Sequence, residues 1–308
     1  MLVAGVDAGG TSTRVAVHTL SGARAGYGTA GGGNPAAHGD AAAAAAIASA
    51  LRQAMGGLDP SSVTASVAGV AGSDGSFAAV LRQVWAEHGL AHAPRLVSDV
   101  DVAYAAGTPA PSGTVLLAGT GAAAARFTGR AVEAVADGLG WLLGDEGGGF
   151  WLGRAGVRAA VHALDGGTPP GPLVDLVSRH FGVTGPPRRR ADRIVRQAQA
   201  DRMTLAAAAP LIGQAAALGD PAAARIVQAA AARLVATVSR LHREGPIVLA
   251  GSVLTSEGAV RDAVMKLLRG HRVSTARDTA GAACWLAALD LAGQDAATTT
   301  HPRFTGAT

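Results

Sequence analysis

The chain has 308 residues, of which 49% are hydrophobic, 16% charged and 4% aromatic. This composition excludes wholesale disorder, and the length predicts about two domains at ~150 residues each. The isoelectric point of about 10.1 suggests a nucleic-acid partner, but the net charge is only +4 and Lys266 is the one lysine, so the high value reflects arginine. Basic residues cluster tightly only at residues 188–190, without interleaved aromatic residues, so we expect no nucleic-acid partner.

Cys284 is the single cysteine. One thiol excludes an internal disulfide, and also a cysteine-based zinc site or iron–sulfur cluster held within one chain. The sequence contains no uninterrupted apolar stretch of ~18 residues, and Asp7 interrupts the first apolar run, which no basic segment precedes. We therefore expect a cytoplasmic protein with no transmembrane helix, no signal peptide and no membrane partner.

The chain opens with two predicted strands joined by a glycine-rich turn. An apolar run ends at Asp7, the turn follows, and residues 14–20 alternate between apolar and polar. A P-loop or a Rossmann turn would instead lead from a strand into a helix. Glycines let a backbone approach an anion closely, and Asp7 could hold hydrated Mg²⁺ beside phosphates, so we interpret the turn as a phosphate loop, with an ordinary hairpin turn as the alternative. The candidate phosphate-binding residues are Gly9, Gly10, Thr11, Ser12 and Thr13.

The same pattern recurs at residues 114–127, where Gly119, Thr120 and Gly121 separate two further predicted strands. Two strand–turn–strand units in one chain suggest an internal duplication. Two similar domains would then face each other across a cleft, and each would present a glycine hairpin to it. The second turn is the shorter one, but pairing with the first strengthens its interpretation, because a triphosphate needs donors from both sides.

Two carboxylates follow a short predicted strand at residues 95–98. Asp99 and Asp101 would point to the same face at strand period, and a carboxylate at a strand end of an α/β domain is well placed to act as a general base. The alternative is that either aspartate caps a helix that begins near Val102. The residues alone do not decide between these two roles.

An irregular loop at residues 138–149 combines six glycines with the adjacent acids Asp145 and Glu146. Its apolar segment at residues 141–143 argues against a solvated linker, and such a loop between structured elements is often functional.

Two shorter turns also offer polar groups. Residues 31–35 present the amide side chain of Asn34, and a late strand ends at Gly251 and Ser252, where a nucleoside could bind the backbone. The chain after residue 149 is mostly helical, with a final helix at residues 281–291.

The chain resembles the N-acetylglucosamine kinase group of the BadF/BadG/BcrA/BcrD ATPase family, which belongs to the actin-like sugar kinase superfamily. The most specific part of the resemblance is a Gly-Asp-Glu-Gly element that follows Gly-Trp. The matching motifs, in order, are GVDAGGTST (5–13), VAGVAG (67–72), SD (98–99), LAGTG (117–121), GWLLGDEGGGFW (140–151), LAGSV (249–253) and GAACWLAAL (281–289).

The resemblance implies an α/β fold of two actin-like (ribonuclease H-like) domains with a cleft between them. The expected N-terminal domain covers residues 1–112 and binds phosphate and sugar. The expected C-terminal domain covers residues 113–291, contains a helical insertion and binds the nucleotide, and residues 292–308 form a flexible tail. The implied activity is ATP-dependent phosphorylation of an amino sugar, N-acetylglucosamine or glucosamine, at the 6-hydroxyl.

The resemblance also implies a role for each matching residue. Asp7 would hold Mg²⁺ through water, and Asp99, which the resemblance favours over the second aspartate, would take the proton from the sugar 6-hydroxyl. Asn34 and Asp145 would bind sugar hydroxyls, and Gly138 would lie near the 2-substituent. The residues implied to bind ATP are Gly9, Gly10, Thr11, Ser12, Thr13, Gly119, Thr120, Gly121, Gly251 and Ser252.

Two departures from the family pattern narrow these expectations. Leu139 and Ala136 occupy the positions at which N-acetylglucosamine kinases carry the tryptophan of a Gly-Trp-Gly element and, in some members, a cysteine, so acetylation of the 2-amino group stays open. The family's iron–sulfur dehydratase activators are excluded, because Cys284 is a lone cysteine in a helix. The alternative functions are a kinase for N-acetylmuramic acid or glucose, and a non-catalytic regulator responsive to sugar or nucleotide. The family suggests a homodimer.

Overall fold

The computed structural model describes residues 1–167, 169 and 171–306, with the side chains of 292 and 294–298 left aside. The chain divides into two compact units. The first unit comprises Met1–Pro111 and Ser274–Thr308, and the second comprises Ser112–Val273.

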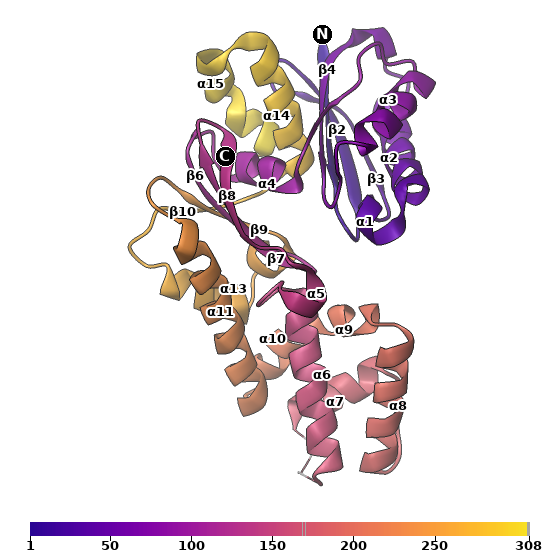
Figure 1. Cartoon of the computed structure of the whole chain (residues 1–308), viewed down its shortest axis with the longest axis vertical. Coiled ribbons are helices and arrows are strands. Elements are labelled where there is room, and N and C mark those ends of the chain that lie inside the picture. Colours follow the sequence, from indigo (N-terminus) through magenta and orange to yellow (C-terminus); the bar gives the residue numbers. More distant parts are fainter. Residues whose placement is uncertain (168, 170, 307–308) are drawn as a thin grey trace. The chain divides into compact units, whose positions relative to one another are not determined.

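The first unit is built on a five-stranded sheet in the order β3-β2-β1-β4-β5, in which β1 pairs antiparallel with β2 and parallel with β4. The central strand β1 is apolar on both faces because helices cover both of them (Figure 1): α2 and α3 lie on one side, and α4 and α14 on the other. The strands are β1 (Leu2–Ala8), β2 (Thr13–Thr19), β3 (Arg24–Ala30), β4 (Val63–Val70) and β5 (Arg95–Val97). The helices are α1 (Pro35–His38), α2 (Asp40–Met55), η1 (Pro60–Ser62), α3 (Phe77–Glu87), α4 (Asp99–Gly107), α14 (Thr279–Ala292) and α15 (Gln294–Thr305).

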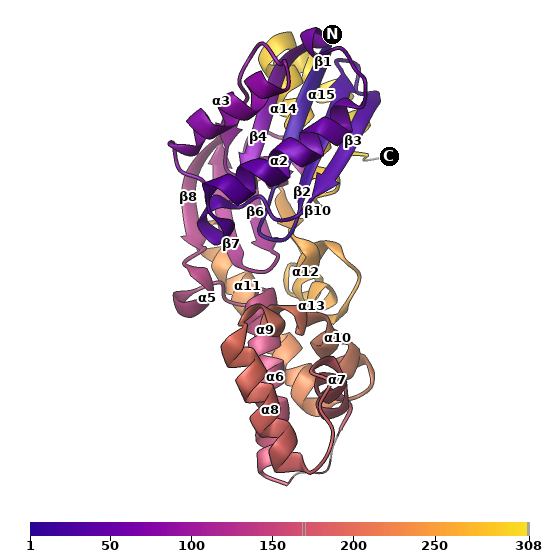
Figure 2. The same ribbon diagram turned by 90° about the vertical axis from the view of Figure 1, so that its right-hand side faces the viewer.

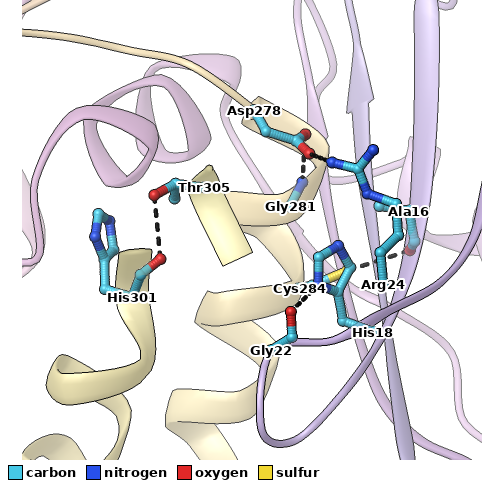
Figure 3. Close-up of polar contacts among 9 residues, drawn as sticks. All are labelled: Ala16, His18, Gly22, Arg24, Asp278, Gly281, Cys284, His301 and Thr305. Carbon is cyan, nitrogen blue, oxygen red and sulfur yellow. Dashed lines mark hydrogen bonds and ion pairs between the residues drawn. The ribbon is translucent and has the colours of Figure 1, made fainter. Parts of the chain in front are cut away.

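The last two helices, α14 and α15, belong to the first unit. This differs from the prediction, which placed the chain up to residue 291 in the C-terminal domain. Helix α14 returns to the N-terminal sheet, where a Cβ built at Gly5 would lie 2.3 Å from the backbone oxygen of Ala280, so only glycine permits this approach. Figure 3 shows two polar contacts that fasten the helix to the strands: Arg24 pairs with Asp278 at 2.6 Å, and Cys284 Sγ donates to the carbonyl oxygen of Ala16 at 3.2 Å.

The predicted flexible tail at residues 292–308 is also corrected, because most of it forms α15. Phe304 is fully buried and its ring stacks on His18 at a centroid distance of 5.2 Å, while Thr305 Oγ1 donates to the carbonyl oxygen of His301 (Figure 3). Burial of these side chains holds the helix against the unit although its composition is polar. Residues 307–308 lie outside the described residues.

The second unit repeats the same sheet, in the order β10-β9-β6-β7-β8. Here β6 pairs antiparallel with β7 and parallel with β9, as β1 does with β2 and β4. This identical order supports the internal duplication that the two glycine turns suggest. The strands are β6 (Gly113–Ala118), β7 (Ala122–Thr128), β8 (Ala131–Asp137), β9 (Ile247–Ala250) and β10 (Val273–Thr275).

Helices supply most of the second unit's core. Helix α11 packs on the sheet. Helices α6 to α10 form a cluster beyond one end of the sheet, the end at which α5 lies (Figures 1 and 2). The core is filled mainly with leucine, valine, isoleucine and alanine. The helices are α5 (Gly140–Leu143), α6 (Gly149–Asp165), α7 (Pro172–His180), α8 (Pro187–Ala200), α9 (Met203–Ala207), α10 (Ala209–Ala217), α11 (Pro221–Leu241), α12 (Ser252–Thr255) and α13 (Ala259–Leu267). Within the described part of the chain, none of the helices combines the length and apolarity that a membrane crossing requires.

Candidate active site

The first glycine turn joins β1 to β2 and is fixed by backbone hydrogen bonds. The N–H of Gly9 donates to the carbonyl oxygen of Ser12 at 2.9 Å, and Thr13 Oγ1 donates to the carbonyl oxygen of Gly31 at 2.8 Å. A Cβ built at Gly10 would meet no atom within 4 Å, and at Gly9 the nearest atom would be 3.7 Å away. Neither glycine has a positive φ. The fold therefore does not require glycine at these two positions, whereas the close approach of a phosphate to the backbone would.

Asp7 lies at the end of β1, immediately before this turn. Its Oδ2 accepts hydrogen bonds from Thr279 Oγ1 at 2.5 Å and from Arg14 Nη1 at 3.2 Å. Burial raises the pKa of this carboxyl above its usual value, and the Thr279 hydroxyl and the Arg14 charge partly offset the effect. Thr279 is a candidate site residue that the sequence did not reveal, because its partner lies 272 residues away in the chain.

Asp99 and Asp101 have different environments in the first turn of α4. Ser98, and neither aspartate, is the N-cap, and Asp101 Oδ2 accepts the Ser98 backbone N–H at 3.0 Å to complete a capping box. Asp99 Oδ1 instead accepts a hydrogen bond from the Ser98 hydroxyl at 3.1 Å. Burial raises the pKa of Asp99, and the negative charge of Asp7 raises it further. Capping of α4 thus falls to Ser98 and Asp101, and Asp99 is the aspartate whose pKa is raised by the charge of Asp7.

The turn that presents Asn34 lies against the first glycine turn. Asn34 is the N-cap of α1, and its Oδ1 accepts the Ala37 backbone N–H at 3.0 Å. Its side chain also packs on Gly72, where a Cβ would lie 2.5 Å from Oδ1. His38 Nε2, which sequence reasoning overlooked, lies 2.7 Å from the carbonyl oxygen of Gly10. The helix α1 is a single short turn, which explains why sequence periodicity gave no signal for it.

In the second unit, three glycine-rich segments that are distant in sequence come together. The N–H of Gly149 donates to the carbonyl oxygen of Gly119 at 2.8 Å, so the acidic loop lies on the second glycine turn. A Cβ built at Gly121 would lie 2.7 Å from Asp145 Oδ2, and one built at Gly251 would lie 2.4 Å from the backbone of Ala118. A Cβ at Gly119 would meet no atom within 4 Å. Ser252 follows Gly251 as the first residue of α12.

The acidic loop is held by a residue just before it, Asp137 at the end of β8. The Asp137 carboxylate accepts the backbone N–H groups of Asp145 at 2.7 Å and of Glu146 at 2.8 Å. Asp137 and Asp145 both have left-handed backbones, with φ of 62° and 55°, a region that aspartate adopts more readily than most residues. The neighbouring Gly138 has φ of 71° and donates its N–H to Ala122 at 3.0 Å. Sequence reasoning missed Asp137 because the glycine-rich pattern begins one residue later.

The two acidic residues of this loop, Asp145 and Glu146, have different electrostatic environments. Burial raises the pKa of Asp145, and the negative charge of Asp137 adds to the effect. Glu146 forms an ion pair with Arg233 of α11, whose guanidinium also lies 5.1 Å from the Trp151 ring centroid. Among the described residues Asp145 has no basic partner, whereas the charge of Glu146 is balanced by Arg233.

The carboxylates of the first unit fit a divalent cation only with additional ligands. Among the residues that the structure describes, no group of three or more histidine, cysteine, aspartate or glutamate side chains is placed to hold a metal. Asp7 and Asp99 offer oxygen ligands and mutually unfavourable charge, which a cation would relieve. Mg²⁺ fits this pair if water and phosphate oxygens complete its coordination, as is usual for Mg²⁺ in phosphoryl-transfer sites.

Comparison with known proteins agrees with this geometry. The sequence profile of the BadF/BadG/BcrA/BcrD ATPase family matches residues 4–284. A protein from Chromobacterium violaceum provisionally named an N-acetylglucosamine kinase is 26% identical, with a TM-score of 0.76, over 92% of this chain and 98% of its own. Its counterpart from Porphyromonas gingivalis is 25% identical, with a TM-score of 0.71, over 98% of both chains. No curated protein sequence matches the chain significantly.

A more distant structure shows similarity of fold alone. The ROK family glucokinase from Streptomyces griseus, solved with glucose and AMPPNP, is 18% identical over 98% of both chains, with a TM-score of 0.55. These matches confirm the predicted fold class, two actin-like α/β domains. The family profile and the first of these structures confirm the predicted class of enzyme, an ATP-dependent phosphotransferase. Since the family profile spans most of the chain, this protein belongs to the BadF/BadG/BcrA/BcrD ATPase family.

Proposed function

We propose that this chain is an ATP-dependent kinase that phosphorylates an amino sugar, N-acetylglucosamine or glucosamine, at its 6-hydroxyl. The observation that carries the proposal is the pair of half-buried carboxylates, Asp7 and Asp99, beside a glycine turn with open backbone. The family match and the two provisionally named N-acetylglucosamine kinases support the choice of substrate class.

Asp99 is the proposed general base. In the transfer, the sugar 6-hydroxyl oxygen forms a bond to the γ-phosphorus, the bond to the ADP oxygen breaks, and the hydroxyl proton passes to an Asp99 carboxylate oxygen. Burial and the Asp7 charge raise the pKa of Asp99, which strengthens it as a proton acceptor once it is ionised. The hydrogen bond from Ser98 orients its other oxygen. Asp101 is already engaged in the capping box and has no role in this step.

Both glycine turns are proposed to bind ATP phosphates through backbone N–H groups. Gly9, Gly10 and Gly119 leave open space in front of the backbone, which suits close contact with phosphate oxygens. Gly251 and Ser252 are proposed to contact the nucleoside. Mg²⁺, bound to Asp7 through water, would neutralise charge on the transferred phosphoryl group, and catalysis would otherwise rest on positioning.

The sugar is proposed to bind through Asn34, Asp145 and Gly138. The Asn34 Oδ1 caps α1, whereas no hydrogen bond from its Nδ2 to a described residue is seen, so the amide can donate to a sugar hydroxyl. Asp145 is a partly buried carboxylate without a basic partner among the described residues, which suits acceptance of hydroxyl hydrogen bonds. Leu139 occupies the position of the family tryptophan and is 69% exposed, so it is the residue to vary when acetamido preference is examined.

The test compares two variants in an assay of sugar-dependent ADP release. Asp99→Asn should lower kcat by ~10²-fold or more, while binding of a fluorescent ATP analogue is retained. The matched variant Asp101→Asn keeps an oxygen that can accept the Ser98 N–H but loses the charge, so it should lower stability by about 1 kcal/mol and keep near-normal kcat. Near-normal turnover of Asp99→Asn would contradict the assigned base, and absence of sugar-stimulated ADP release in the wild type would contradict the proposed function.

A further inference from the structure

An open cavity of about 490 Å³ lies in the helical part of the second unit, where α7 ends and α8 begins. It is lined by Asp175, Ser178 and Arg179 of α7, by the loop at residues 183–185, and by Arg190 of α8. The residues proposed above to bind ATP, Mg²⁺ or sugar do not line it. A cavity of this volume is within the range of small-molecule sites.

The cavity takes in one end of the only tight basic cluster in the sequence. Arg188, Arg189 and Arg190 occupy the first turn of α8, whose N-cap offers no side-chain hydrogen bond and whose first turn contains no acid. Positive side chains at the positive end of a helix repel its dipole, so this arrangement is unfavourable unless anions compensate it. Arg188 is compensated, because it pairs with Asp165 at 2.6 Å and with Asp192 at 3.0 Å.

Arg190 lacks such compensation. Its Nη1 donates to the Ser178 hydroxyl at 3.3 Å, and its Nε is buried without a hydrogen-bond partner among the described residues. Within the same described residues, neither Arg190 nor Arg179 has a carboxylate at ion-pair distance. Two guanidinium side chains thus line the cavity without a carboxylate partner among the described residues, and this arrangement favours an anionic ligand.

We propose that this cavity binds a phosphorylated sugar. Arg179 and Arg190 supply planar, charged donors that suit a phosphate group, and Thr184 supplies a hydroxyl at the same cavity wall. Asp175 also lines the cavity, and its carboxylate would repel a bare phosphate ion but accept hydrogen bonds from sugar hydroxyls. The combination of two guanidinium groups and one carboxylate therefore selects a phosphate that carries a polyhydroxylated group over phosphate alone. This site is separate from the proposed active site and does not depend on its activity.

The first measurement is calorimetric titration of the full chain with glucosamine 6-phosphate, glucose and inorganic phosphate. In the double variant Arg179→Gln/Arg190→Gln, the binding component that we assign to the cavity should have an affinity for glucosamine 6-phosphate lower by ~10-fold or more, the scale of a charge-assisted hydrogen bond. Arg189→Gln, which changes the neighbouring arginine outside the cavity, should bind as the wild type does. Asp99→Asn should retain the same component. Thermal unfolding shows whether each variant is still folded. If the double variant is not, Arg190→Lys is tested in its place.

The second measurement locates the ligand. Phenylglyoxal modifies accessible arginines, and peptide mass spectrometry reports each site. Glucosamine 6-phosphate should protect Arg179 and Arg190 from modification but leave Arg189 reactive, and glucose should protect neither. The proposal is overturned if inorganic phosphate binds or protects as well as the sugar phosphate does, if no protection is seen, or if Asp99→Asn alone removes the binding component.

Discussion

The carboxylate of Asp137 accepts the backbone N–H of Asp145 at 2.7 Å, and it accepts that of the next residue, Glu146, as well. One side chain thereby fixes a backbone that glycines on either side would otherwise leave free. We expect Asp137→Ala to leave two partly buried N–H groups unsatisfied, to lower stability by about 1–3 kcal/mol, and to raise the KM for the sugar more than the KM for ATP. Steady-state kinetics with each substrate varied, together with urea unfolding, checks this.

The control for Asp137 lies on the same strand. Glu133 pairs with Arg126 at 2.7 Å at an exposed position, so Glu133→Gln should change stability by less than about 1 kcal/mol and leave both KM values unchanged. Asp137→Asn keeps one acceptor and should fall between the wild type and Asp137→Ala. Equal sugar KM values for Asp137→Ala and Glu133→Gln would show that the loop does not depend on Asp137.

The second glycine turn offers a matched pair of substitutions. A methyl group at Gly121 would lie 2.7 Å from the Asp145 carboxylate, whereas one at Gly119 would meet no atom within 4 Å. Gly121→Ala should therefore displace Asp145 and raise the KM for the sugar. Gly119→Ala should fold normally and weaken ATP binding, because the open space is proposed to admit phosphate. If both variants raise the same KM, the proposed division between sugar and phosphate contacts at this turn is wrong.

Asp99 is expected to lower stability when it is ionised. Its pKa is raised from 3.8 by burial and by Asp7, so the folded state holds a proton that the unfolded state has already released. Stability attributable to this group therefore increases as pH falls through the raised pKa, and the Asn variant should be more stable than the wild type at about pH 7 but not at about pH 4. Urea unfolding of the wild type and Asp99→Asn across this range is the measurement. A difference that grows toward acid pH would contradict the assigned environment.

Thr279, the first residue of α14, links this helix to the candidate site. Its hydroxyl donates to Asp7 and lowers the pKa of that carboxyl. We expect Thr279→Val to raise the pKa of Asp7 further, to shift the acid limb of the kcat/KM profile to higher pH, and to lower kcat/KM by ~10-fold, the scale of a lost hydrogen bond to a charged group. Thr279→Ser keeps the hydroxyl and should retain the wild-type profile. Identical profiles for the Val and Ser variants would remove Thr279 from the site.

The sequence predicted those parts of the fold that depend on local pattern. Both strand–turn–strand units and the mostly helical chain after residue 149 follow from local pattern, and the structure has them. The return of α14 to the first sheet was not predictable in this way, because it depends on close contact between Gly5 and a helix backbone far along the chain. The tail was misjudged because its composition is polar, whereas burial of Phe304 decides its structure.

Some residues of the candidate site could be predicted from local sequence pattern, and others could not. Motif residues such as Asp7, Asp99 and Asp145 could be named from sequence because their type and neighbours are distinctive. Residues that support them, Thr279 and Asp137, carry no such signature, since each acts through a tertiary contact. The cap of α4 is intermediate: the sequence suggested Asp99 or Asp101 as the cap of a helix from about Val102, whereas the helix begins at Asp99 and its N-cap is Ser98, with Asp101 completing a capping box.

The proposed reaction transfers the phosphoryl group to the 6-hydroxyl oxygen of an amino sugar. The most direct measurement is the NMR spectrum of the product after the wild-type chain is incubated with ATP, Mg²⁺ and, in separate reactions, glucosamine, N-acetylglucosamine, N-acetylmuramic acid and glucose. We expect rapid formation of a 6-phosphate from glucosamine or N-acetylglucosamine, with phosphorus coupled to the protons on C6, and loss of that product in Asp99→Asn. Phosphate on another carbon, faster turnover of glucose or N-acetylmuramic acid than of either amino sugar, or ATP turnover that no sugar stimulates would contradict it.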